Sequence, residues 1–211
     1  MFYLNRRNSM KRVLAITLFL VSITAVLYAD DPNTPYHPQV SIMTSKGEIV
    51  VELRPEKAPK TVENFLEYVN SGFYENTIFH RVIKGFMIQG GGLTADLNKK
   101  KTRDPIRNEA DNRLSNRKYT IAMARTNDPH SATSQFFINT ASNAPLDFKN
   151  QSQAGWGYCV FGRVIKGMEV VDAIENVKTS SNGMMNDVPV ETIVITGAKV
   201  LNPPAEKESN Q

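Results

Sequence analysis

The sequence predicts one mainly β domain, either a closed antiparallel barrel or a sandwich, capped by helices. Short apolar or alternating runs, separated by Gly, Asn and Asp, recur between residues 40 and 201. Two segments have helical periodicity, and the strands do not alternate with helices as they do in a parallel sheet. The chain has 211 residues, 41% of them hydrophobic, which suits one domain with a sizeable core.

A hairpin and a helix open this domain. Val40–Thr44 and Glu48–Arg54 are joined by Lys46-Gly47, which predicts a β-hairpin. Between Pro59 and Gly72, apolar residues recur at i, i+3, i+4 and i+7. This spacing predicts a helix with one apolar stripe that packs against a sheet, formed by Val62, Phe65, Leu66 and Val69.

The rest of the domain is predicted to consist of short strands and one more helix. Met168–Val177 has apolar residues on one side and is the second helical segment. The strands predicted after the first helix are Ile78–Val82, Phe86–Gln89, Thr120–Ala124, Ser134–Asn139, Tyr158–Val164 and Glu191–Val200.

Two of these strands carry bulky apolar groups on both faces. In Phe86–Gln89, the period of two places Phe86 with Ile88 on one face and Met87 with Gln89 on the other. In Ser134–Asn139, one face has Phe136 and Ile138, and the other mixes amides with an aromatic ring: Gln135, Phe137 and Asn139. The second face fits either an outer binding groove or packing against a helix, and the pattern alone leaves both open.

The N-terminal residues have the layout of a secretory signal peptide. Residues 1–29 hold four of the 25 basic residues and none of the 21 acidic ones, so residues 30–211 carry 21 of each and are formally neutral. A cationic start is followed by the apolar run Val13–Ala29, which predicts export and cleavage after about Ala29. The alternative is an uncleaved anchor, although the run of 17 residues is short for a membrane span.

The remaining boundaries follow from proline and polar content. Residues 30–39 form a Pro-containing linker, residues 40–201 the folded domain, and residues 202–211 a polar tail.

The segment Lys99–Lys118 has eight basic and three acidic residues without interleaved aromatics. We interpret it as a solvated connecting loop in preference to an anion-binding surface, and we expect no nucleic-acid partner.

The usual catalytic and metal-binding patterns are missing. His37, His80 and His130 lack metal-ligand spacing, and the single cysteine, Cys159, lies in an apolar run, where it is expected to be a buried small hydrophobe. Gly90-Gly91-Gly92 has no following Gly-Lys-Ser/Thr, so a tight bend is preferred to a phosphate cradle. We therefore expect neither a metal nor a cofactor.

Three motifs nevertheless resemble one enzyme family. Phe79–Gly92 (FHRVIKGFMIQGGG), Ser134–Asn139 (SQFFIN) and Phe161–Met168 (FGRVIKGM) resemble the cyclophilin family of peptidyl-prolyl cis/trans isomerases, and Tyr119–Arg125 with Gly155–Phe161 resembles its bacterial branch. The resemblance spans residues 40–201. It implies an eight-stranded closed antiparallel β-barrel capped by two α-helices, with a proline-binding site on the outer face.

The resemblance also assigns roles to individual residues. Arg81 is implied to be the catalytic group, with Gln89 orienting it or the substrate backbone. The substrate-binding residues implied are Phe86, Met87, Phe137 and Leu146, which wall the proline pocket, Gln135 and the backbone near Arg125, which hold the peptide, and Tyr158 at the pocket rim.

Two positions near the pocket depart from the eukaryotic members of the family. Pro145 stands just before Leu146, where they carry Trp, and Tyr158 replaces a His. Trp156 lies upstream, in a bacterial-type insertion, and we do not expect it to take the place of that Trp. The resemblance therefore does not extend to sensitivity to cyclosporin, an inhibitor of the family that contacts that Trp.

Together these features predict a monomeric periplasmic peptidyl-prolyl cis/trans isomerase that acts on proline-containing unfolded or flexible polypeptides, without membrane insertion after signal cleavage. The alternatives are a non-catalytic peptide-binding chaperone that uses the same groove and an anchored surface protein.

Overall fold

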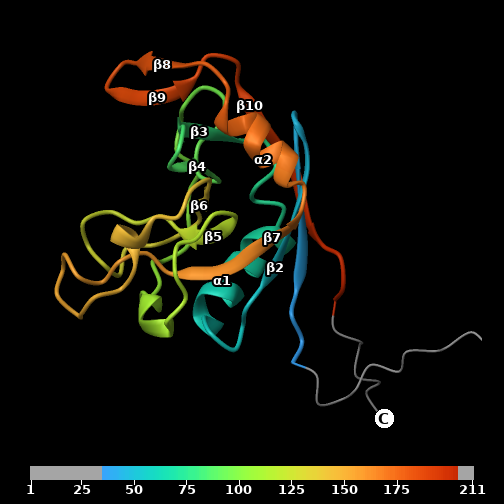
Figure 1. Cartoon of the computed structure of the whole chain (residues 1–211). Helices are drawn as coiled ribbons and strands as arrows, with labels where there is room; N and C mark the ends of the chain where they lie inside the picture. Colours follow the sequence, from blue (N-terminus) through green and yellow to red (C-terminus); the bar gives the residue numbers. More distant parts are fainter. Residues whose placement is uncertain (1–34, 204–211) are drawn as a thin grey trace, which may run out of the picture. The chain divides into compact units, whose positions relative to one another are not determined.

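The computed structural model describes residues 35–203, in which eight antiparallel strands close into a barrel (Figure 1). Around the barrel the strands follow the order β1-β10-β3-β4-β6-β5-β7-β2. These strands are β1 (Gln39–Thr44), β2 (Gly47–Leu53), β3 (Thr77–Ile83), β4 (Met87–Gly90), β5 (Thr120–Met123), β6 (Phe136–Asn139), β7 (Val160–Lys166) and β10 (Ile193–Val200).

Two α-helices accompany the barrel, α1 (Pro59–Asn70) and α2 (Met168–Glu175). Two single 3₁₀ turns lie in the connections, η1 (Ala110–Asn112) and η2 (Ala144–Leu146). The barrel, rather than a sandwich, is thus the correct alternative, and both helices begin where the periodicity predicts. The signal peptide expected at residues 1–29 lies outside the described residues. Among residues 35–203, no helix has the length and apolar character needed to cross a membrane.

The barrel interior is filled by aromatic and aliphatic side chains. Phe65 of α1 lies 5.7 Å from Phe136 of β6, ring centroid to centroid, and 5.2 Å from Phe161 of β7. All three rings have no exposed surface. The stripe predicted for the first helix is therefore the surface that packs against the barrel strands. The helix ends at Asn70, and Gly72 follows in the left-handed conformation (φ 67°).

The prediction of a strand at Phe86–Gln89 is wrong at its first residue. The strand begins at Met87, and Phe86 belongs to the turn after β3, where its N–H donates to the carbonyl of Ile83 (3.1 Å). Ile88 points into the core, whereas Phe86 packs outside the barrel with Met87. The alternation of side chains along a strand does not apply to Phe86, because this residue lies in the turn before β4.

A hairpin outside the barrel was not predicted. Strands β8 (Thr179–Asn182) and β9 (Met185–Pro189) pair with each other, and β9 contacts β3 (Figure 1). All four residues of β8 are exposed, so no apolar alternation marks it in the sequence. This hairpin lies next to the strand that carries Arg81.

Candidate active site

A β-bulge in β3 directs Arg81 out of the barrel. Phe79 pairs with Gly90 and Arg81 pairs with Gln89, so two steps on β3 match one step on β4. The extra residue is His80. Without the bulge Phe79 and Arg81 would share a face, but here Phe79 is in the core and the Arg81 side chain is 45% exposed.

The registers of five adjacent strands place the outward side chains of the site in one row. Gln89 pairs with both Arg81 and Phe137, and Ala122 pairs with both Phe137 and Val160. Across β3, β4, β6, β5 and β7 the row therefore reads Arg81, Gln89, Phe137, Ala122 and Val160.

A cavity of about 190 Å³ lies over the first three residues of this row, Arg81, Gln89 and Phe137. Met87 and Phe137 are 3% and 4% exposed and provide apolar wall surface, while Arg81 and Gln89 provide polar groups. Eight of the nine residues implied by the family motifs line this cavity: Arg81, Phe86, Met87, Gln89, Arg125, Phe137, Leu146 and Tyr158. Ala124, which was not predicted, also lines it.

The far wall of the cavity is held by contacts between loops. The Tyr158 N–H donates to the Leu146 carbonyl (2.9 Å), and the Tyr158 ring meets Phe137 edge to face at 5.6 Å. The Arg125 guanidinium lies 4.6 Å from the centre of the Tyr158 ring and donates from Nε to the carbonyl of Gly157 (2.9 Å). Arg125 thus contributes its side chain to the wall.

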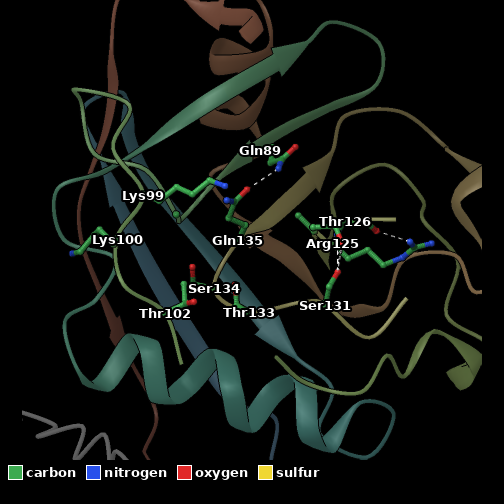
Figure 2. A pocket seen from close by; sticks show the side chains of 12 residues that line it. Gln89, Lys99, Lys100, Thr102, Arg125, Thr126, Ser131, Thr133, Ser134 and Gln135 are labelled. Atoms are coloured by element: carbon green, nitrogen blue, oxygen red, sulfur yellow. Dashed lines mark hydrogen bonds between the residues drawn. The ribbon is translucent and has the colours of Figure 1, made fainter. Parts of the chain in front are cut away.

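Gln135, the ninth predicted residue, lies in a neighbouring hollow. Its Oε1 accepts a hydrogen bond from Gln89 Nε2 (2.9 Å), shown as a dashed line in Figure 2. A Cβ atom at Gly92 would collide with the Gln135 side chain, and one at Gly91, whose φ is 80°, would lie 2.7 Å from the Phe136 ring. Gly90 ends β4, and Gly91 and Gly92 form a bend that lets Gln135 and Phe136 approach closely.

This second hollow, of about 280 Å³, continues the first along the surface. The two share Gln89, Ala124 and Arg125, and the rest of the second lining is mostly polar. Lys99 and Lys100, at the start of the basic segment, contribute to it (Figure 2). The combined surface has an apolar socket at one end and mostly polar groups at the other.

Among the described residues, no Ser, Thr, Cys, Lys or His lines the cavity of about 190 Å³. No group of three or more His, Cys, Asp or Glu side chains within residues 35–203 could hold a metal ion. Cys159 faces the core and is 3% exposed, and burial raises its pKa to about 12. Trp156 is also outside the cavity, where it packs against His130 and Phe148.

Asp187 is a further residue of the site region, and it was not among the predicted site residues. Its Oδ2 lies 3.7 Å from Arg81 Nε. It belongs to the unpredicted hairpin, so nothing in the sequence pattern connects it with Arg81.

The comparisons with known proteins agree with this arrangement. Residues 39–200 match the family described as cyclophilin type peptidyl-prolyl cis-trans isomerase. The peptidyl-prolyl cis-trans isomerase cyp18 of Streptomyces antibioticus is 61% identical over 162 residues, covering 77% of this chain and 98% of that one. The peptidyl-prolyl cis-trans isomerase A of Dickeya dadantii is 51% identical over 191 residues, covering 90% and 98%.

A solved structure shows the same fold. The cyclophilin type isomerase of Cryptosporidium parvum superposes with a TM-score of 0.64 at 29% identity, covering 80% of this chain and 100% of that chain. The eight-stranded barrel and its outer cavity thus define an isomerase of X-Pro peptide bonds. The chain belongs to the cyclophilin-type peptidyl-prolyl cis-trans isomerase family.

Proposed function

We propose that the chain accelerates X-Pro isomerisation through Arg81, in exported polypeptides that are folding. The observation that carries this proposal is the place of Arg81: a bulge turns its guanidinium outward, to the rim of a cavity with buried Met87 and Phe137 in its wall. The cavity suits a proline ring, and the guanidinium lies beside it.

The reaction requires no covalent chemistry. Rotation about the bond must break amide resonance, and the barrier is about 18–20 kcal/mol. In the twisted amide the nitrogen regains a lone pair, so a donor that meets this nitrogen or its surroundings stabilises the transition state more than the planar ground state. A guanidinium keeps its charge at all working pH values, which makes Arg81 suited to this role.

The expected contribution of this donor is limited. A hydrogen bond to a charged group contributes about 1.5–3 kcal/mol. At about 1.36 kcal/mol per decade, this corresponds to one to two decades of rate. The remainder comes from holding one side of the bond while the other rotates, for which the apolar socket and the Gln89–Gln135 pair are the supporting features.

Export is supported by the N-terminal sequence. Its cationic start, apolar run and Ala29 fit a cleaved signal peptide. The match to the Dickeya relative covers 191 residues, which is longer than the stretch from Gln39 to the C-terminus and therefore includes part of this N-terminal region. A chain that works outside the cytoplasm meets polypeptides that fold after translocation, and prolines make that folding slow.

Substitution of Arg81 tests the mechanism. Arg81→Ala is expected to lower kcat/KM on an Ala-Pro-Phe peptide by about 10- to 100-fold, with the cis/trans exchange followed in a protease-coupled assay. Arg81→Lys keeps the charge but loses the planar fork of donors, so an intermediate rate is expected. Arg117→Ala, which removes an exposed arginine from the connecting loop, is the matched control and should keep the full rate.

A folded Arg81→Ala variant with the unchanged rate would contradict the Arg-assisted mechanism. Circular dichroism melting of each variant shows whether it is folded. Suppression of aggregation of an unfolded client, measured on the same variants, distinguishes the peptide-binding alternative, which does not require the guanidinium.

A further inference from the structure

We propose that Asp187 is a positioning residue for the isomerase reaction, and that it acts by holding the Arg81 guanidinium at the rim of the cavity. This inference rests on the proposed role of Arg81. It assigns a function to the β8–β9 hairpin, which lies outside the barrel and next to β3.

The first observation is the geometry of the pair. Asp187 Oδ2 approaches Arg81 through Nε, the guanidinium nitrogen closest to the side-chain stem, at 3.7 Å. This side-on approach leaves the terminal nitrogens Nη1 and Nη2 as donors for the substrate. The Arg81 side chain is 45% exposed, so its long stem has many rotamers open to it unless a partner restricts them.

The second observation is the backbone that presents the carboxylate. Ser180 pairs with Val188 and Asn182 with Met185, so β9 has one more residue than β8 between these pairs. This β-bulge contains Asp187, whose φ is 61°, in the left-handed region. Bulges next to active sites commonly redirect a side chain, and aspartate tolerates the left-handed conformation better than most residues.

Contacts of β9 with β3 place the bulge against the barrel, and the residue after Asp187 is buried. Val188 is 7% exposed, and the Val190 N–H donates to the Lys178 carbonyl (2.9 Å) at the base of the hairpin. The tip, by contrast, is open, with Met184 completely exposed. The hairpin thus holds its Asp187 end against β3 while the rest extends into solvent.

Holding Arg81 in this way favours the transition state, because the guanidinium interacts most strongly with the twisted amide. Loss of such an interaction lowers kcat and kcat/KM together and leaves KM unchanged. The pair is partly exposed, so the effect is modest: Asp187→Asn is expected to lower kcat about three- to fivefold, within the range of exposed ion pairs. High salt should reduce the difference in kcat between the wild type and Asp187→Asn.

Asp187→Gly separates this role from a structural one. Glycine removes the carboxylate but accepts a φ of 61° without strain, so the melting temperature should stay the same or rise while kcat falls as in Asp187→Asn. Glu191→Gln is the matched control. Glu191 lies near the same end of the chain and pairs with Lys46 (2.9 Å), away from the cavity, so this variant should keep the full rate.

The decisive measurement is a double-mutant cycle with Arg81→Ala, using the protease-coupled assay. If Asp187 acts through Arg81, Asp187→Asn slows the enzyme in the wild-type background and has no further effect once Arg81 is alanine. An equal loss in both backgrounds would mean a structural role and would overturn the inference.

The two proposals can fail separately. A fully active Arg81→Ala variant refutes the Arg-assisted mechanism, whatever Asp187→Asn does. A slow Arg81→Ala variant combined with a fully active Asp187→Asn variant refutes only the positioning role.

Discussion

At the scale of single residues, the bulge in β3 turns Arg81 outward, while its extra residue, His80, is buried. His80 is 5% exposed, and its Nδ1 has no hydrogen-bond partner among the described residues. Burial is the main cause that lowers its pKa from 6.5 to about 4, and the charge of Arg81 adds to this effect. The imidazole is therefore neutral in the native state at neutral pH.

This histidine predicts a loss of stability in mild acid. Between pH 6.5 and about 4 the unfolded chain binds a proton at His80 that the folded chain does not, so the free energy of unfolding falls as the pH drops through this window. At about 1.36 kcal/mol per pKa unit the total is on the order of 3 kcal/mol. Urea unfolding of His80→Gln should show a flatter decline from pH 7 to 5 than the wild type.

The test compares how the free energy of unfolding changes with pH in the two proteins, so the stability cost of the substitution itself cancels. At pH 8 His80 is neutral in both states, so the difference measured there is the cost of changing the side chain. If the variant and the wild type lose the same free energy between pH 7 and 5, then His80 does not control this dependence.

The individual residues of the candidate site could be predicted only from the motifs that resemble the cyclophilin family. Period-two alternation correctly separated Ile138 from Phe137. Alternation fails at Phe86, which lies in a turn, and at Arg81, which follows a bulge. Asp187 could not have been found, because its proximity to Arg81 depends on a tertiary contact between β3 and β9.

At the scale of elements, α1 takes its N-terminal cap from a distant segment. Ala58 provides no side-chain cap, and Glu109 accepts hydrogen bonds from the N–H groups of Lys60 (3.1 Å) and Thr61 (2.8 Å). The carboxylate satisfies two free donors and meets the positive end of the helix. The basic segment is a connecting loop, as predicted, but it is not solvated throughout, because Asn108, Ala110 and Asn116 are buried. Through Glu109 it also anchors the helix that packs on the barrel.

Removal of this cap is expected to destabilise the whole domain. Glu109→Ala should lower the free energy of unfolding by about 1–2 kcal/mol, as other lost caps do. Chemical denaturation should show a lower midpoint with an unchanged m-value. Asp111→Asn removes an exposed carboxylate from the same segment and should shift the midpoint much less. Equal midpoints for Glu109→Ala and the wild type would show that Glu109 does not cap α1.

Most elements were predictable because they bury one apolar face. All eight barrel strands and both helices coincide with predicted segments, with ends that differ by a few residues. The β8–β9 hairpin was missed because it buries little and has no apolar alternation. Its one sequence signal is the turn at Gly183, whose φ of 60° favours glycine.

At the scale of the whole molecule, the barrel is complete without the first 29 residues. Strand β1 pairs on one side with β2 and on the other with β10. The two ends of the barrel are also tied together, because the Gln39 N–H donates to Asn202 Oδ1 (2.6 Å) and the Leu201 N–H donates to the Gln39 carbonyl (2.8 Å). The cationic N-terminal residues thus add charge to the chain, while the closure of the barrel depends on residues 39–202.

This separation predicts that a chain beginning at Asp30 keeps both the fold and the activity. Its melting temperature should lie within about 2 °C of that of the full chain, since the pairings that close the barrel all lie within residues 39–202. Its kcat/KM on the Ala-Pro-Phe peptide should be unchanged. A large loss of either quantity would mean that residues 1–29 belong to the folded enzyme.

The same residues should direct export when the full chain is produced in Escherichia coli. We expect the protein in the periplasmic fraction, with an intact mass that corresponds to Asp30–Gln211. Leu18→Arg places a charge in the apolar run and should leave the uncleaved precursor in the cytoplasm, because a short run with a charge no longer partitions into the membrane. Recovery of the full-length wild-type chain in the membrane fraction would instead identify an anchored isomerase, with its barrel held at the membrane by the run Val13–Ala29.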